Sequence, residues 1–377
     1  MMMMAKSDTL SPSTSASDSS PATPKPVGIA VVGLGMGRHH IPKFNEHPLG
    51  QVVAVCDADK GRLGEVAKAF DIAHAFADFD AMLEAAKGSG IDAVSIALPN
   101  HLHAPASIRA LKAGLHVMCE KPLALHAPEA QEMVTIAKEL NRKLAVHYNF
   151  RMSAQHQFVG MMRDAGEFGT MRHIRCGWLR QRGIPSWGSG WFYDRKRSGG
   201  GVLIDLGVHM LDCALWAAGF PKVVAVSGQV ANAFGPIDVP DKNMDVDDLA
   251  MAFIRCENGL TISLEMSWAG TPLEQEHIFF SLFGDHAGAH WQIRPFGPKA
   301  WTPVLEVVKR QHGGLVRQEV TEFSPTARAL SVEWDFVDAI AADRDPLCRG
   351  DEGVTVMQVI DAIYESSRTG REVVVGE

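Results

Sequence analysis

The amino-acid sequence predicts an α/β protein of two domains, the first built on a doubly wound parallel sheet. Its 377 residues exceed what one hydrophobic core usually serves. Strand-like and helix-like segments alternate through the first half, an order typical of parallel sheets with helices on both faces. A glycine-rich turn joins the first strand-like segment to the first helix. We therefore expect domains at 27–147 and 148–377, preceded by a disordered tail at 1–26.

The tail is dominated by Ser, Thr, Ala and Pro. It holds no apolar run that could form a signal-peptide core, and such a composition is typical of disorder. An organelle or export address is a minor alternative, although the arginines that these addresses favour are absent.

The glycine-rich turn marks the start of the first sheet. Three glycines follow the apolar segment 27–32: Gly33, Gly35 and Gly37. A second apolar segment, 51–56, ends at Asp57. Such glycines let the backbone approach a pyrophosphate, and a carboxylate after the second strand accepts ribose hydroxyls, so the pattern predicts a dinucleotide-binding Rossmann fold. Arg38 departs from the strict pattern, which has Gly or Ala there.

Polar residues follow the later strands of this sheet. Strand-like segments lie at 93–98, 115–119 and 143–147, with helix-length segments at 104–113 and 128–140. Ligands of doubly wound sheets bind beyond the carboxyl ends of the strands, so segments 99–103 and 120–122 should line the cofactor cleft. His101 and His103 also form an HxH pair. We favour a cleft or structural role over metal binding, because no third ligand lies nearby in the sequence.

These patterns define the predicted cofactor contacts, and Asp57 bears on which cofactor binds. The predicted contacts are Gly33, Gly35, Met36, Gly37, Arg38, Asp57, Leu98, Asn100, His103, Glu120 and Lys121. Asp57 would repel a 2′-phosphate, which favours NAD over NADP. NADP stays the alternative, since Arg38 or Arg62 could accommodate that phosphate.

Segment 198–212 places ionisable side chains on an apolar helix. Its ionisable residues are Asp205, His209 and Asp212. Residues three and four apart on a helix share one face, so these side chains should lie along a single stripe. Burying a charge costs several kcal/mol unless the charge is paired. The segment therefore predicts a catalytic or metal-binding pair, with a self-satisfied His–Asp pair in a core as the alternative.

Lys121 is a further candidate, at the predicted end of a strand. Pro122 follows it and keeps the backbone at Lys121 out of the helical region, which aims the side chain reproducibly. An isolated lysine is usually a solvated surface group. Its place beside a predicted dinucleotide favours a functional role here.

The amino-acid composition indicates which class of ligand the protein binds and in which cell compartment it works. A formal net charge of −8 argues against nucleic acid, which normally needs a basic face, and small molecules are the expected ligands. No charge-free run of about 18 apolar residues occurs, so no membrane span is expected. The six cysteines form no CxxC pair, which favours reduced thiols in a cytoplasmic protein.

Four segments together resemble the Gfo/Idh/MocA family, named after glucose–fructose oxidoreductase and inositol dehydrogenase. They are GLGMGRHH at 33–40, CEKPLA at 119–124, YNFR at 148–151 and SGGGVLIDLGVHMLD at 198–212. The resemblance implies a Rossmann domain followed by an α/β domain with a large, mostly antiparallel open sheet, which commonly packs into homodimers or homotetramers. Strand-like segments in the second half agree, at 171–179, 223–230, 249–255, 260–268 and 278–283.

The resemblance also implies roles for three residues. Lys121, Asp205 and His209 match the family's catalytic positions. His209 would take the proton of a substrate hydroxyl while the carbon loses hydride to the nicotinamide. Asp205 would orient the imidazole, and Lys121 would stabilise charge on the reacting oxygen. The roles of His209 and Lys121 could be exchanged.

The expected substrate is a sugar, a cyclitol or a sugar acid. The predicted substrate contacts are Lys121, Arg151, Trp191, Asp205 and His209. Trp187 offers a second aromatic face for a sugar ring, and Arg180 and Arg182 offer further donors. Core packing or a solvated basic loop is the structural alternative for these side chains.

Four functions are open from the sequence. An NAD-dependent sugar or cyclitol dehydrogenase is the preferred one. A hydrolase or lyase that retains NAD for a transient oxidation, and a regulator that binds the dinucleotide without turnover, are the alternatives. A metal held by Asp205 and His209 is a minor fourth.

Overall fold

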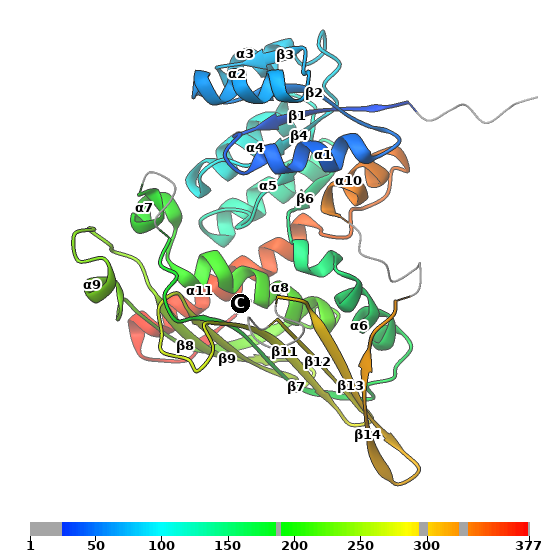
Figure 1. Ribbon diagram of the computed structural model, residues 1–377, viewed down its shortest axis with the longest axis vertical. Helices are drawn as coiled ribbons and strands as arrows, with labels where there is room; N and C mark the ends of the chain where they lie inside the picture. Colours follow the sequence, from blue (N-terminus) through cyan, green and yellow to red (C-terminus); the bar gives the residue numbers. More distant parts are fainter. Residues whose placement is uncertain (1–24, 186–189, 294–300, 324–330, 376–377) are drawn as a thin grey trace, which may run out of the picture.

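The computed structural model describes residues 25–185, 190–293, 301–323 and 331–375. The predicted disordered tail lies outside these residues except for its last two positions. Figure 1 shows a first sheet and its helices, in blue and cyan, above a second, larger sheet. Two helices, α8 (Val208–Ala217) and α11 (Gly350–Thr369), lie between the sheets.

The first sheet has the strand order β3-β2-β1-β4-β5-β6, and every neighbouring pair is parallel. Its strands are β1 Val27–Val32, β2 Gly50–Cys56, β3 His74–Phe76, β4 Ala93–Ile96, β5 His116–Cys119 and β6 Leu144–Val146. Every residue of β1 is buried, because helices cover both faces of the sheet. The strand order reverses between β1 and β4, which is where doubly wound sheets bind their ligands. The predicted Rossmann fold is confirmed.

The helices of this part follow the predicted alternation. They are η1 Gly37–His39, α1 His40–Glu46, α2 Lys60–Ala69, α3 Phe79–Ala85, η2 Asn100–Leu102, α4 His103–Lys112 and α5 Ala127–Glu139. Aspartates cap two of them, because the Asp59 and Asp78 carboxylates accept the first free backbone N–H groups of α2 and α3. The helix after the glycine turn begins as a single 3-10 turn, η1.

The second sheet is mostly antiparallel, as the family resemblance implies. Its strand order is β14-β13-β12-β11-β7-β10-β9-β8-β15, and only β7 and β10 pair in parallel. The strands are β7 Met171–Arg180, β8 Val223–Ala231, β9 Leu249–Cys256, β10 Thr261–Ser267, β11 Glu276–Gly284, β12 Ala287–Ile293, β13 Val304–Gln311, β14 Gly314–Val320 and β15 Val373–Val374. The sequence did not predict β12 to β15. Strand β14 is mostly exposed and shows no strong apolar alternation, whereas β12 alternates but does so partly through small Ala and Gly residues.

The remaining helices connect and cover this sheet. They are η3 Asn149–Met152, α6 Ala154–Asp164, η4 Trp191–Tyr193, α7 Arg195–Ser198, η5 Leu203–Gly207, α9 Gly235–Asp238 and α10 Val332–Ala341, besides α8 and α11. By length and composition the stretch Arg195–Ala217 could cross a membrane, but 89% of its most apolar window is buried inside the protein, as in a core helix.

Helix α10 returns to the first sheet, where it packs on α1, β5 and β6 (Figure 1). Just beyond it the Val146 amide donates to the Cys348 carbonyl at 2.9 Å. Residues 332–348 therefore lie against the first sheet, although the predicted division at residue 147 places them in the second domain. That division is otherwise a prediction.

Candidate active site

An ion pair joins the two halves of the protein at the end of β5. The Lys121 ammonium donates to the Asp205 Oδ1 at 2.9 Å and to the Asp205 carbonyl at 3.0 Å. Trp268 completes the pair, since its indole N–H donates to Asp205 Oδ2 at 3.1 Å. Burial alone would raise the pKa of Asp205, but the attraction of Lys121 and its hydrogen bond lower it. The carboxylate therefore stays ionised at neutral pH.

His209 lies on α8 in an aromatic setting. Its ring lies 5.5 Å from the Phe150 ring and 6.1 Å from the Trp178 ring, between centroids. Its Nδ1 is buried with no hydrogen-bond partner among the described residues. Burial and the nearby Lys121 charge lower the pKa of His209 to about 3. The imidazole is therefore neutral at physiological pH, the form that can accept a proton.

Among the described residues no hydrogen bond joins Asp205 to His209, whose orientation the resemblance assigns to Asp205. Both carboxylate oxygens of Asp205 are taken, one by Lys121 and the other by Trp268. The reason is local: Leu203–Gly207 forms a π-turn, η5, and only the residues after it form α8. The wider turn breaks the regular spacing that would have stacked residues four apart on one face. The expected Asp205–His209 pair is thus replaced by a Lys121–Asp205 pair.

Asp247 holds the glycine loop that leads into this turn. Its carboxylate accepts the backbone N–H of Gly201 and of Leu203, both at 2.9 Å, and the Tyr364 hydroxyl at 2.8 Å. A Cβ at Gly201 would lie 1.7 Å from the Asp247 carbonyl oxygen, so only glycine fits there. This clamp fixes where η5 starts and hence where Asp205 points.

The glycine turn after β1 has the form that the sequence predicts. Gly33 has a φ of +86°, and a Cβ there would lie 2.4 Å from the Ala97 carbonyl oxygen. At Gly37 a Cβ would meet the Val31 side chain at 2.8 Å. A Cβ at Gly35 would meet no protein atom within 4 Å. Packing therefore requires two of the glycines but not Gly35, which fits a turn that a pyrophosphate approaches.

Asp57 supports this turn from the end of β2. Its Oδ2 accepts the Leu34 amide at 2.7 Å, and the Arg62 guanidinium binds both carboxylate oxygens at 2.9 and 3.0 Å. Burial would raise the pKa of Asp57, but these hydrogen bonds lower it. The carboxylate is ionised, and Arg62 partly offsets its charge.

Among the other predicted cofactor contacts, Met36 and Arg38 are exposed on the glycine turn. Three more are committed to protein partners. Both ring nitrogens of buried His103 contact carbonyl oxygens, of Pro122 at 2.6 Å and of Leu98 at 2.7 Å. The Asn100 amide donates to the Ser198 carbonyl at 2.8 Å. Glu120 is bound by neighbouring histidines. The side chain of His103 therefore holds the two cleft segments together, and the prediction that it contacts the cofactor is wrong.

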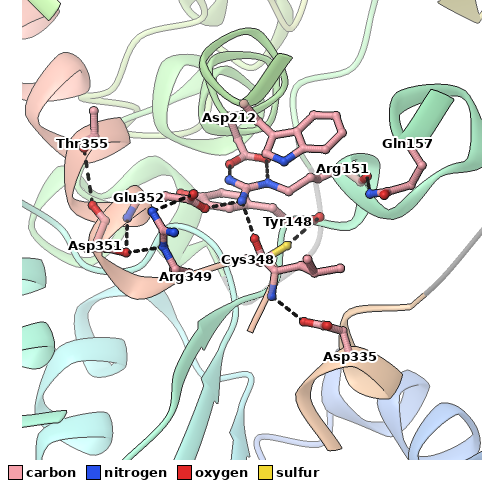
Figure 2. Close-up of polar contacts among 12 residues, drawn as sticks. Tyr148, Arg151, Gln157, Asp212, Asp335, Cys348, Arg349, Asp351, Glu352 and Thr355 are labelled. Carbon is pink, nitrogen blue, oxygen red and sulfur yellow. Dashed lines mark hydrogen bonds and ion pairs between the residues drawn. The ribbon is translucent and has the colours of Figure 1, made fainter. Parts of the chain in front are cut away.

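Arg151 is not where a substrate could reach it. Its side chain is fully buried, and its guanidinium binds the carboxylates of Asp212 and Glu352 and the Leu347 carbonyl (Figure 2). The predicted substrate contact is wrong because the 3-10 turn η3 directs Arg151 into the core between α8 and α11. The neighbouring residue, Phe150, is the one that contacts His209.

The loop before η4 is only partly described. Trp187 lies outside the described residues. Trp191 stacks on Phe192 with ring centroids 4.0 Å apart, and its role in substrate binding stays a prediction. Arg180 lies over the Trp178 ring and pairs with Glu276 at 2.6 Å. Arg182 donates to the Ala269 carbonyl at 3.1 Å.

Sequence reasoning missed three aromatic residues of the site. Trp268 ends a predicted strand and Trp178 lies within another, but nothing in their local pattern indicates which side chain they meet. Phe150 lies inside the YNFR segment, in which the sequence predicts its neighbour Arg151 as the substrate contact. Only the paired strands β7 and β10 bring the two tryptophans beside η5 and α8.

Comparisons with known proteins show which family the chain belongs to. Residues 27–148 match the model of the oxidoreductase family with an NAD-binding Rossmann fold, and residues 156–290 match the GFO/IDH/MocA C-terminal domain. D-glucoside 3-dehydrogenase of Escherichia coli is 30% identical over 362 residues, covering 93% of this chain and 98% of that protein. This chain belongs to the Gfo/Idh/MocA oxidoreductase family.

Further relatives support the same family. D-apiose dehydrogenase of Paraburkholderia graminis is 27% identical to this oxidoreductase, covering 91% of this chain and 88% of that protein. A solved structure of levoglucosan dehydrogenase with NADH and levoglucosan aligns with a TM-score of 0.80 at 24% identity. It covers 94% of this chain and 100% of that one, which supports the two-sheet fold.

Proposed function

We propose that this oxidoreductase transfers hydride between the ring-carbon hydroxyl of a sugar or cyclitol and NAD. The observation that carries the proposal is the arrangement around Asp205: the Lys121 ammonium binds its carboxylate and its carbonyl, and His209 follows on α8 with a buried Nδ1 that has no partner among the described residues. The named relatives act on sugars and sugar derivatives, which supports the substrate class. Cytoplasmic location and a homodimer or homotetramer belong to the same proposal.

The chain's own residues would divide the work as follows. An ammonium has three N–H donors, and Asp205 uses two of those of Lys121, which leaves one for the oxygen of the substrate. His209, being neutral, would accept the hydroxyl proton. Negative charge that develops on this oxygen offsets the Lys121 charge and so raises the proton affinity of His209. NAD, when bound, supplies the hydride acceptor.

The residues around the glycine turn fit this cofactor. The open space beside Gly35 suits a pyrophosphate, and the Asp57 carboxylate at the end of β2 suits ribose hydroxyls. The backbone after β1 would therefore hold the pyrophosphate of NAD, and Asp57 would hold its ribose.

A substrate panel tests the function. We expect NAD reduction with at least one member of a set of aldoses, sugar acids, inositols and anhydro sugars, and loss of that signal in His209→Ala. Absorbance of the reduced nicotinamide is the measurement. If the wild type binds NAD but reduces none with any member, the dehydrogenase proposal fails.

Cofactor choice is tested at Asp57. We expect the wild type to bind NADH more tightly than NADPH, and Asp57→Ser to improve NADPH binding by about tenfold, because the change removes a repelling carboxylate and frees Arg62 for the 2′-phosphate. Titration of cofactor fluorescence gives both dissociation constants. The double variant Asp57→Ser with Arg62→Gln is the control and should lose the gain. Tighter NADPH binding by the wild type would contradict the preference.

A further inference from the structure

Beside Lys121, four ionisable side chains meet from four different elements. They are His40 of α1, Glu120 after β5, His147 after β6 and Glu333 of α10. Each of these side chains is at most 15% exposed. We call this group the Glu120 cluster. None of its members has a role in the hydride transfer described above.

The cluster is connected to Lys121 through the backbone. Glu120 Oε1 lies 3.1 Å from the His40 Nε2 and 3.2 Å from the His147 Nδ1. Its other oxygen, Oε2, accepts the backbone N–H of Lys121 at 3.1 Å. One carboxylate thus joins two histidines to the residue whose ammonium binds Asp205.

Glu333 supports His147 from the far side. The His147 Nε2 lies 3.2 Å from Glu333 Oε1, so each ring nitrogen of His147 faces a carboxylate. Two carboxylates so close to the ring favour the imidazolium, the form that carries an N–H on both nitrogens. Burial would lower the pKa of His147, but Glu120 and Glu333 outweigh burial and raise it to about 9.

The same residue types could suggest a metal site. Donor atoms of His40, His147 and Glu333 lie within 4.8 Å of one another. The two imidazole rings, however, are stacked with centroids 4.6 Å apart and planes inclined by 23°. An imidazole binds metal through the lone pair in its ring plane at about 2.0–2.1 Å, and two stacked rings cannot aim both lone pairs at one ion. Protons and hydrogen bonds hold this cluster together.

We propose that Glu333 and His147 are positioning residues: they hold the Glu120 carboxylate against the Lys121 amide and thereby keep the Lys121 ammonium on Asp205. Helix α10, which lies near the C-terminal end of the sequence, thus helps to position the Lys121 ammonium. The kinetic consequence rests on the proposed function, whereas the structural consequence does not.

Glu333→Gln tests the proposal, because it keeps the side-chain size and removes the charge. His147 then keeps only the Glu120 carboxylate as its charged partner, so its pKa falls toward the ordinary value near 6.5. We expect kcat to fall about 10- to 100-fold, as for a small misplacement of a reacting group, with KM little changed. The kcat of the variant should also decline as pH rises from 6.5 to 8, where the wild type is flat because its His147 stays charged, since the variant loses the charged ring in that window.

Hydrogen exchange at the Lys121 amide gives a readout that needs no turnover. In Glu333→Gln we expect this amide to exchange about tenfold faster, since its acceptor is less firmly held. Faster exchange in a protein whose wild type oxidises no sugar would leave the positioning proposal standing and reject the proposed function. Wild-type exchange together with a wild-type pH profile in Glu333→Gln would overturn the positioning proposal.

Asp338→Asn is the matched control. Asp338 lies on the same helix and forms the same kind of pair with His47 of the α1 C-terminus at 3.0 Å. Unlike His147, His47 forms no ion pair with Glu120 among the described residues. We expect its kcat profile and its Lys121 exchange to equal those of the wild type. If Glu333→Gln fails to fold, His147→Gln serves instead: it should lose kcat similarly but show no decline between pH 6.5 and 8, because the titrating ring is gone. Wild-type kcat and exchange in His147→Gln would equally overturn the proposal.

Discussion

Replacing Lys121 by methionine lowers kcat for sugar oxidation by about a thousandfold and leaves NADH binding within about twofold of the wild type. The ammonium is the only cation that binds Asp205 among the described residues, and it carries the free N–H that would stabilise charge on the substrate oxygen. Methionine keeps the length of the side chain but offers no donor. Steady-state kinetics and cofactor titration on the same preparation measure both effects.

Lys143→Met is the matched control for this substitution. Lys143 also forms an ion pair at 2.9 Å, with Asp343, and its side chain is only 12% exposed. It lies at the start of β6, at the opposite end of the sheet from the cleft, so kcat should not change. A Lys121→Met enzyme with more than about a tenth of wild-type kcat would show that this ammonium does not stabilise the reacting oxygen.

Replacing Arg151 by methionine lowers the free energy of unfolding by about 3–5 kcal/mol. The guanidinium is fully buried and lies between two carboxylates, those of Asp212 and Glu352 (Figure 2). Its removal leaves Asp212 without a cation in the core, so that acid must stay uncompensated or take up a proton, whereas Glu352 keeps Arg349 at 3.1 Å. The midpoint and slope of a urea unfolding curve measure the loss.

Arg172→Met provides the comparison for an exposed pair. Arg172 binds Asp285 through two nitrogens but is 64% exposed, so its loss should change the stability far less than the loss of Arg151. The KM of folded Arg151→Met for the sugar should equal that of the wild type. A stable Arg151→Met enzyme with a strongly raised KM would restore Arg151 as a substrate contact.

Much of the fold could be predicted from local patterns. The glycine turn, five of the six strands of the first sheet and the acid at Asp57 depend on neighbours in sequence, and the structure places them as expected, whereas the short strand β3 was not predicted. The exposed strand β14 could not be found in this way, because its pattern of buried and exposed residues is weak. The packing of α10 on the first sheet could not be predicted, because it depends on the path of the chain from the second sheet back to the first.

Sequence patterns predicted several residues of the candidate site, such as Lys121 and Asp205, but not the contacts between them. Separate motifs predict Lys121 and Asp205 as functional residues, but the two lie 84 positions apart in the sequence, and nothing in it indicates that they form an ion pair. Asp205 was assigned to His209 from regular helical spacing, which the π-turn at Leu203–Gly207 removes. Arg151 was assigned to the substrate because a charged side chain in a motif suggests function, whereas burial between two acids decides its role.

The sequence by itself determined where the strands, the glycine turn and the chemically capable side chains occur, because these features depend on residue type and short-range spacing. Only the tertiary structure decided which carboxylate forms an ion pair with which cationic side chain. Three acids near the cleft, Asp205, Asp212 and Glu120, take their partners from distant elements: Lys121, Arg151 and His147. A buried charge is satisfied by whichever donor the packing brings within reach, and spacing along the chain does not record that distance.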